Sequence, residues 1–129
     1  MTETTAAATY LFPGDHREAL AGRPELLLSA GRPLVGTEVR IVDEQDQLLP
    51  NGSIGEVAIR GPQLMRGYWN RREASEESLR GGWMHTGDQA TIDEEGYCKI
   101  VGRIKDMVIR GGENVYPAEI ENALMAHEG

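Results

Sequence analysis

Apolar and polar positions alternate along the middle of the chain. Val39 and Ile41 fall on one face of a predicted strand, and Val57 and Ile59 fall on one face of the next. The segment Pro50-Asn51-Gly52 between them has the composition of a tight turn. A period of two with a turn between the runs predicts antiparallel strands joined by a hairpin connection.

Other segments follow the same reasoning. Further strands are expected at residues 90–92, 98–101 and 107–110, the first two joined by the turn at 93–96. Asn70 is expected to cap a short helix over residues 71–79, with Glu76 and Arg80 paired along it, and Gly81-Gly82 to end it. Pro117 suits the first position of a last helix. Its apolar stripe would consist of Ile120, Ala123, Leu124 and His127.

These elements predict an α+β fold. The first thirty residues are interpreted mainly as loop, with breakers at Pro13-Gly14-Asp15 and Gly22-Arg23-Pro24. Residues 1–104 are expected to form a β-rich, barrel-like subdomain with short helices. Residues 105–129, a strand pair and a helix, have too little apolar material for a separate core. We expect them to be the start of a second domain.

The composition is that of a globular protein and argues against several other classes. The chain has 129 residues, about one domain at roughly 150 residues per domain, and is 40% hydrophobic and 26% charged, as in globular proteins. Its net charge of −8 argues against a nucleic-acid partner. It has no apolar run near the ~20 residues of a membrane span and no signal-peptide pattern. One cysteine, Cys98, excludes an internal disulfide. We expect a cytoplasmic protein.

Several familiar site patterns are missing. The sequence contains neither GxxxxGK[ST] nor GxGxxG, so it predicts no conventional phosphate loop. His16, His85 and His127 lie far apart without cysteine or carboxylate at ligand spacing, which argues against a metal cage. Cys98 alternates with Ile100, and we interpret it as a small buried hydrophobe and not as a nucleophile.

Two stretches offer polar groups suited to a nucleotide. Residues 1–5, MTETT, place three hydroxyls around one carboxylate, which could contact a phosphate and a magnesium ion; the alternative is a frayed terminus. In His85-Thr86-Gly87-Asp88, the aspartate could accept two hydrogen bonds from a vicinal diol such as a ribose. The alternative there is an Asx-type turn.

Two more stretches are long and rich in glycine and charge. Residues 55–69 are interpreted structurally, as a strand, a turn and two aromatic anchors, Tyr68 and Trp69. The run GRIKDMVIRGGENVYPAEIE, residues 102–121, has charged residues between two strands, which suggests a hinge. Gly111-Gly112 would allow a tight loop where a ligand approaches the backbone.

The order and spacing of these stretches resemble one family. From Met1 to Glu121 the chain is similar to the adenylate-forming (AMP-binding) synthetases, which include acyl- and aryl-CoA ligases, luciferases and the adenylation domains of peptide synthetases. HTGD followed by GRIKDMVIRGGENVYPAEIE carries the resemblance. The GGENVYPAEIE part looks more like the CoA ligases than the peptide synthetases. Ile109 stands where luciferases typically carry a second lysine.

The resemblance implies a nucleotide site. Thr2 matches the threonine that contacts the adenylate phosphate, and Glu3 matches the glutamate associated with Mg²⁺. Asp88 matches the aspartate that binds the ribose hydroxyls, and Arg103 matches the arginine that supports the same ribose.

It also implies two half-reactions. A carboxylate attacks the α-phosphate of ATP to give an acyl-adenylate and pyrophosphate, and the thiol of coenzyme A then displaces AMP. Lys105 matches the hinge about which the small C-terminal domain rotates between them. Gly112 matches the glycine of the loop that enters the site for thioester formation.

Other parts of the family's site lie outside the matching segment. The phosphate loop and most of the acyl pocket lie upstream in the family, and a late catalytic lysine lies downstream. We therefore expect an inactive piece of an acyl-CoA ligase, with a fatty acid as the default substrate, that associates as a homodimer or by strand exchange. The alternative is a stand-alone, non-catalytic AMP-binding or interaction module.

Overall fold

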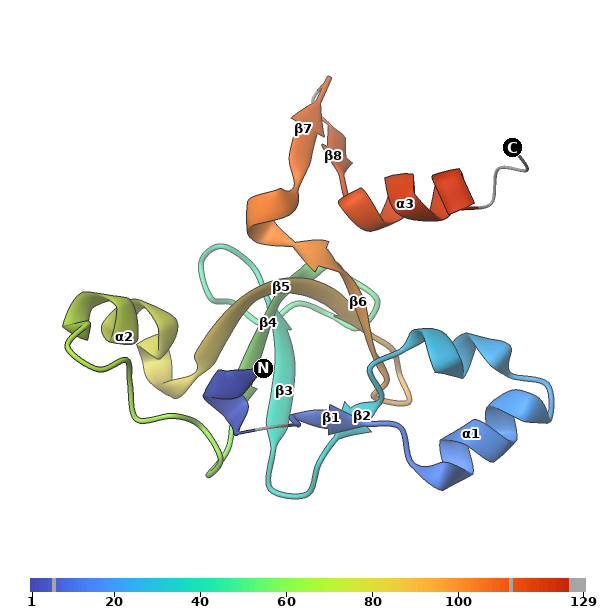
Figure 1. Ribbon diagram of the computed structural model, residues 1–129, viewed down its shortest axis with the longest axis horizontal. Helices are drawn as coiled ribbons and strands as arrows, with labels where there is room; N and C mark the ends of the chain where they lie inside the picture. The colour runs from blue at the N-terminus through green and yellow to red at the C-terminus, as the bar shows by residue number, and fades with distance from the viewer. Residues whose placement is uncertain (6, 112, 126–129) are drawn as a thin grey trace.

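The computed structural model describes residues 1–5, 7–111 and 113–125 (Figure 1). In chain order the elements are η1 (Thr2–Thr4), β1 (Thr9–Tyr10), α1 (Pro13–Leu20), η2 (Pro24–Leu28), β2 (Arg32–Pro33), β3 (Glu38–Val42), β4 (Gly55–Arg60), α2 (Arg72–Ser78), η3 (Arg80–Gly82), β5 (Met84–Ile92), β6 (Cys98–Arg103), η4 (Ile104–Asp106), β7 (Val108–Arg110), β8 (Glu113–Val115) and α3 (Pro117–Met125). None of the helices in these ranges is long and apolar enough to cross a bilayer.

The α+β class is confirmed. Strands β3, β4, β5 and β6 form one antiparallel sheet in that order, and β1–β2 and β7–β8 form two small sheets (Figure 1). The expected barrel-like closure is wrong for the described residues: β3 and β6 lie at opposite edges of the four-stranded sheet and do not pair. The sheet is therefore open.

The predicted alternation places the main core on one face of this sheet. Its buried members are Ile41, Val57, Ile59, Met84, Ala90 and Cys98. The interpretation of Cys98 as a buried hydrophobe is confirmed, and burial raises the pKa of its thiol to about 11. A thiol with so high a pKa is a poor nucleophile at neutral pH.

Trp83 forms the core of the opposite face. It packs with Val42 and Ala58, which are fully buried. The guanidinium carbons of Arg40 and Arg60 lie 3.8 Å and 4.4 Å from the centre of its ring. Both faces of the sheet are thus covered near Trp83, which explains why Ala58, between Val57 and Ile59 on β4, is buried as they are.

The first thirty residues contain more regular structure than expected. Pro13 does not break the chain but begins α1, because a proline at the first helical position loses no internal hydrogen bond. The Asp15 carboxylate accepts a hydrogen bond from the N–H of Phe12 at 2.7 Å and so caps the helix start. Pro24 begins η2 in the same way.

Asp15 also fastens α1 to the β5–β6 hairpin. Its carboxylate is buried and accepts hydrogen bonds from the Tyr97 hydroxyl at 2.8 Å and from Arg32 at 2.9 Å. Burial alone would raise the pKa of Asp15, but the bonds from Tyr97, the Phe12 N–H and Arg32 together hold it below its ordinary value of 3.8.

We expect Asp15→Asn to lower the melting temperature at pH 7, and the deficit to shrink on acidification. The folded-state pKa lies below the unfolded value, so ionised Asp15 stabilises the fold above the unfolded value, and this contribution disappears as pH falls through the folded-state pKa. Thermal melts of both proteins between pH 7 and pH 3 measure it. Glu94→Gln, at an exposed acid of the nearby turn, is the control. A deficit independent of pH would contradict the assignment.

The helix after residue 70 differs from its prediction in detail. It begins at Arg72 with Arg71 at the N-cap, and Asn70 adopts a positive φ of 53° outside it. The pair along the helix is Arg72–Glu76 at 2.7 Å, not Glu76 with Arg80. Arg80 instead follows the helix in η3 and points to β4 and the β3–β4 loop, as described below.

The C-terminal part projects from the β-rich body (Figure 1). The predicted strand pair and helix are confirmed as β7, β8 and α3. Tyr116 is buried against the end of β6: a Cβ atom at Gly102 would lie 3.3 Å from its Cδ1. On α3, Ile120 and Leu124 are exposed, while His127 of the expected stripe lies outside the described residues.

Candidate nucleotide site

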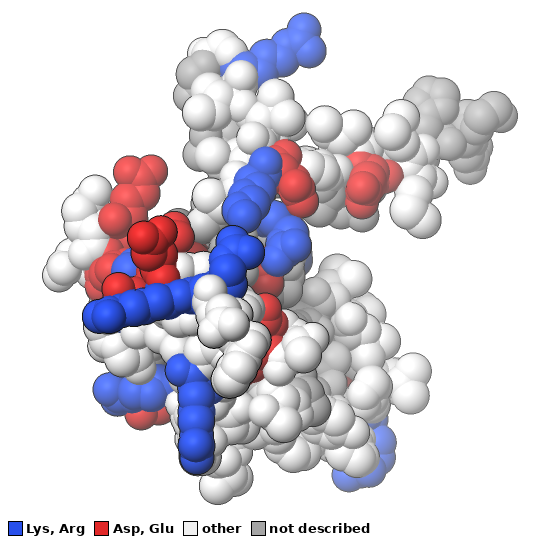
Figure 2. Space-filling view, turned by 60° about the vertical axis from the view of Figure 1, so that its left-hand side comes forward, with Lys and Arg blue, Asp and Glu red and all other residues white. Residues whose placement is uncertain are grey.

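A cleft of about 560 Å³ lies where the N-terminus, β5 and η4 meet, and it brings together four of the six predicted site residues. They are Glu3, Asp88, Arg103 and Lys105. Figure 2 shows acidic and basic side chains side by side on the face that carries α2, below the projecting C-terminal part. Sequence order alone places Glu3 and Lys105 at opposite ends of the chain, so their shared cleft is a result of the fold.

Asp88 and Arg103 form a directly bonded pair in the lining of this cleft. They are opposite each other in the β5–β6 register. Arg103 Nε donates to Asp88 Oδ1 at 2.8 Å, from an exposed side chain to a half-buried one. The pairing fixes a carboxylate and a guanidinium side by side at the cleft. Together they offer acceptors and donors to a vicinal diol.

The hydrogen bonds of Thr86 and the backbone conformation of Gly87 orient Asp88 toward the cleft. Thr86 Oγ1 donates to the Val57 carbonyl at 3.0 Å and accepts from the Asp88 N–H at 3.1 Å. Gly87 adopts φ +72°, a conformation that favours glycine. The side-chain-stabilised turn is therefore made by Thr86, and the Asx-type alternative for Asp88 is wrong. The strand begins before this segment, at Met84, earlier than predicted.

Glu3 is held in place from both backbone and side chain. Its carbonyl accepts a hydrogen bond from the Met65 N–H at 2.8 Å, and its Oε1 accepts one from the Tyr68 hydroxyl at 3.0 Å. The N-terminal residues form η1, with Thr4 buried, so the frayed-terminus alternative is wrong. Burial and the Glu3 carboxylate raise the pKa of Tyr68.

Tyr68 is therefore a residue of the site that sequence reasoning missed. It was interpreted only as an aromatic anchor, together with Trp69, which is in fact 90% exposed. The contact with Glu3 spans 65 positions along the chain, and no local pattern signals it.

The remaining predicted residues are Thr2, Lys105 and Gly112. Thr2 is exposed in η1, and its neighbours Met1 and Glu3 line the cleft. Lys105 is exposed in η4, between β6 and β7, where it also lines the cleft. Gly112 lies outside the described residues.

A second polar cluster lines part of the same cleft through Glu56, Arg80 and His85. His85 Nδ1 is 3.0 Å from Glu56 Oε2 and 3.7 Å from Asp46 Oδ1. These three side chains could in principle hold a cation. Arg80 already supplies a positive charge there, at 2.9 Å from Asp46 and 3.2 Å from Glu56. We therefore assign this cluster to Arg80 and not to a metal ion.

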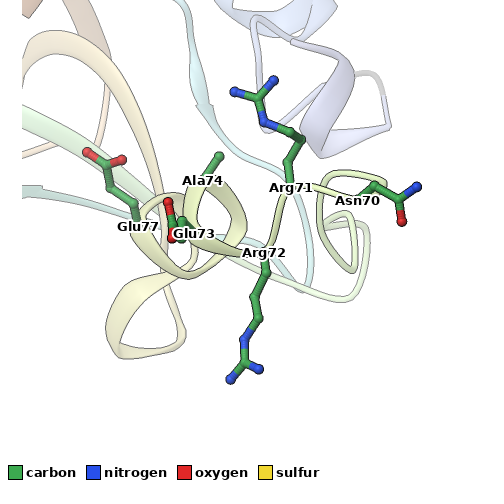
Figure 3. A pocket seen from close by; sticks show the side chains of 6 residues that line it. All are labelled: Asn70, Arg71, Arg72, Glu73, Ala74 and Glu77. Carbon is green, nitrogen blue, oxygen red and sulfur yellow. The ribbon is translucent and has the colours of Figure 1, made fainter.

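An adjoining hollow of about 460 Å³, which shares Ala74 and Glu77 with the cleft, lies at the start of α2 (Figure 3). Its lining residues are Asn70, Arg71, Arg72, Glu73, Ala74 and Glu77. The side chains of Arg71 and Arg72 point to opposite sides and do not converge on one point. The hollow contains none of the predicted site residues, so the nucleotide site is assigned to the cleft around Asp88.

Comparison with known proteins decides the family. Residues 1–69, more than half of the chain, match the sequence profile of the AMP-binding enzyme family. The chain belongs to this family. This match, together with the relatives described next, confirms the resemblance inferred from HTGD and the GRIKDMVIRGGENVYPAEIE run.

Relatives of this chain include CoA ligases with different acids. It is 50% identical over 105 residues to a feruloyl-CoA synthase of Amycolatopsis, covering 81% of this chain and 21% of that one. It is also 50% identical over 101 residues to a long-chain-fatty-acid–CoA ligase of Escherichia coli O6:H1, covering 78% and 18%. The chain thus spans about a fifth of the length of these relatives.

A solved structure of similar fold contains nucleotide. O-succinylbenzoate coenzyme A synthetase from Bacillus subtilis, in complex with ATP and magnesium ion, superposes with a TM-score of 0.84 at 38% identity. The match covers 98% of this chain and 25% of that one.

Proposed function

We propose that this chain is the ribose- and magnesium-facing part of an ATP-dependent acid–CoA ligase. The observation that carries the proposal is the Asp88–Arg103 pair, fixed across β5 and β6 in one cleft with Glu3 and Lys105. A carboxylate held by a cross-strand guanidinium can accept hydrogen bonds from both ribose hydroxyls of ATP or AMP. Family membership and the nucleotide-bound relative support the same assignment.

The N-terminal residues would face the phosphates. Glu3 presents a carboxylate at the cleft, the oxygen ligand that Mg²⁺ prefers, so its chemistry fits the ion. Bound Mg²⁺ would neutralise negative charge on the phosphate oxygens. The Tyr68 hydroxyl donates to one Glu3 oxygen and so orients the carboxylate. Thr2, one residue before Glu3, would donate its hydroxyl to the adenylate phosphate.

Two further residues, Lys105 and Gly112, are proposed to act in the change from the first half-reaction to the second. In the first, the acid's carboxylate oxygen bonds to the α-phosphorus of ATP and pyrophosphate leaves. In the second, the CoA thiol loses its proton, its sulfur bonds to the acyl carbon, and AMP leaves. We assign Lys105 to the hinge between a large domain ending at residue 104 and a mobile domain beginning at residue 105. Its place in η4, the link to the projecting β7–β8 hairpin, supports this division. Gly112 would belong to the loop that serves the second half-reaction.

The proposed acid is a fatty acid. The long-chain-fatty-acid–CoA ligase relative supports it, and the feruloyl-CoA synthase relative of equal identity makes a hydroxycinnamic acid the competing choice. The polar residues of the cleft, Glu3, Asp88 and Arg103, are assigned to the nucleotide, so the choice of acid rests on the relatives.

The test uses the native protein captured from its source cells with an antibody to this chain. Its intact mass is measured, and ATP–pyrophosphate exchange is then assayed with fatty acids of several lengths and with ferulate. We expect exchange that depends on a fatty acid. Preference for ferulate would overturn the fatty-acid assignment alone. A 14.2 kDa protein without exchange for any acid would overturn the ligase and favour a stand-alone module.

A further inference from the structure

We propose that Glu56 is a positioning residue that sets the ribose-binding carboxylate of Asp88 by holding the backbone of Gly87. The inference rests on the proposed nucleotide function, because the positioned carboxylate would serve to bind ribose. The contacts that position Asp88 all lie within this chain, so the positioning itself can be tested without nucleotide.

The need for such a residue comes from a bulge in β5. Glu56 pairs with Gln89 and Ala58 pairs with His85, so two steps along β4 correspond to four steps along β5. Residues 86–88 therefore lie opposite Val57 alone. Where the ladder is interrupted in this way, backbone groups need partners other than the neighbouring strand.

Glu56 supplies that partner. Its Oε1 accepts a hydrogen bond from the Gly87 N–H at 2.9 Å. The same bulge uses Thr86 Oγ1, which bonds the Val57 carbonyl on one side and the Asp88 N–H on the other. The Glu56 carboxylate thus binds the Gly87 N–H, and the Thr86 hydroxyl binds the Asp88 N–H and the Val57 carbonyl, in place of ladder bonds.

The Glu56 carboxylate is itself fixed. Its Oε2 lies 3.0 Å from His85 Nδ1 and accepts a hydrogen bond from Arg80 at 3.2 Å. The Glu56 side chain is only 14% exposed, and His85 beside it is 3% exposed. The carboxylate therefore binds His85 of β5 and Arg80 of η3 through Oε2, and it binds the Gly87 N–H through Oε1.

Asp88 is next to this anchored residue. Gly87 has the left-handed φ of +72°, and Asp88 follows it directly into the pairing with Arg103. A shift of the Gly87 peptide would move the start of Asp88 and loosen its hydrogen bond to Arg103 Nε. The polar cluster of Arg80, His85 and Glu56 is thus the support of the ribose site, and not a separate metal site.

The test compares a variant that shortens the Glu56 side chain with a variant that removes its charge. Glu56→Gln keeps an oxygen at the same distance from Gly87, and Glu56→Asp keeps the charge but is one methylene shorter. In ¹⁵N-labelled chain without nucleotide, we expect Glu56→Asp to move the Gly87 amide proton upfield and to speed exchange of the Arg103 Nε–H about tenfold. Glu56→Gln keeps an acceptor for the Gly87 N–H and should leave the Gly87 and Arg103 signals near wild type, while its amide NH₂ faces the donors of Arg80 and His85 and shifts their signals. Asp46→Asn, which touches Arg80 and His85 but not Gly87, is the matched control.

The opposite ranking, or unchanged Gly87 and Arg103 signals in a folded Glu56→Asp protein, would overturn the proposal. If Glu56→Asp does not fold, Glu56→Ser, short and still polar, is measured in its place with the same expectation. A second readout compares AMP with 2′,3′-dideoxy-AMP. Glu56→Asp should weaken AMP about tenfold and leave the dideoxy compound unchanged, whereas a merely structural defect would weaken both. If wild type binds neither, the nucleotide function fails while the Gly87 and Arg103 signals still decide the role of Glu56.

Discussion

Replacing Asp88 by asparagine is expected to weaken AMP binding by about ten- to a hundredfold. Asparagine has nearly the same shape, but it loses the charge that pairs with Arg103 and one of the two acceptors offered to the ribose. Hydrogen bonds to charged groups contribute about 1.5–3 kcal/mol each, and every 1.4 kcal/mol corresponds to about tenfold in affinity. Isothermal titration calorimetry of the chain with AMP measures the change.

Glu38→Gln is a closely matched control for Asp88→Asn. Glu38 and Arg60 form the same kind of cross-strand pair at 2.7 Å, on β3 and β4. Loss of the Glu38 charge should leave AMP binding unchanged. Arg103→Ala should weaken binding, and the double variant Asp88→Asn/Arg103→Ala should lose less than the sum, because the two side chains act as one unit. Equal weakening by Glu38→Gln would show a general effect of charge and would contradict a ribose site at Asp88.

The largest effect on stability is expected for Met84→Ala. Met84 is 2% exposed and packs between β4 and β6 with Val57, Ile59 and Cys98. Truncating a buried methionine removes apolar contacts and leaves a cavity, which costs about 2–5 kcal/mol. That is a large share of the ~5–15 kcal/mol that stabilises a typical domain. Urea titration followed by fluorescence of the buried Trp83 measures the loss.

Met125→Ala is the matched control, because Met125 is 86% exposed on α3. We expect its unfolding midpoint to stay near that of wild type. A small effect at Met84, or an equal effect at both methionines, would contradict the placement of the core between β4, β5 and β6.

The sheet could be predicted because its pattern is local. Val39 and Ile41, and likewise Val57 and Ile59, are large apolar residues two positions apart, and this period of two needs no knowledge of distant segments. Helix starts were harder. Pro13 was interpreted as a breaker because proline serves both loops and first helical positions, and the contact that decides between them, from Asp15 to the buried Tyr97, crosses 82 positions.

Only the site residues that lie within recognisable motifs could be predicted from the sequence. Asp88 and Arg103 lie in recognisable motifs, and their contact follows once β5 and β6 pair. Glu56 and Tyr68 were missed because each acts on a residue in another part of the chain, Gly87 and Glu3. A carboxylate on a strand and a tyrosine in a loop have no spacing that marks such roles.

The most direct test of the ribose assignment is a titration of the ¹⁵N-labelled chain with AMP and with 2′,3′-dideoxy-AMP. The two compounds differ only in the hydroxyls that Asp88 is proposed to bind. We predict that AMP at millimolar concentration shifts the Asp88 amide and the Arg103 Nε–H signals, and that the dideoxy compound leaves them in place. Equal shifts with both compounds, or no shift with AMP, would contradict the account.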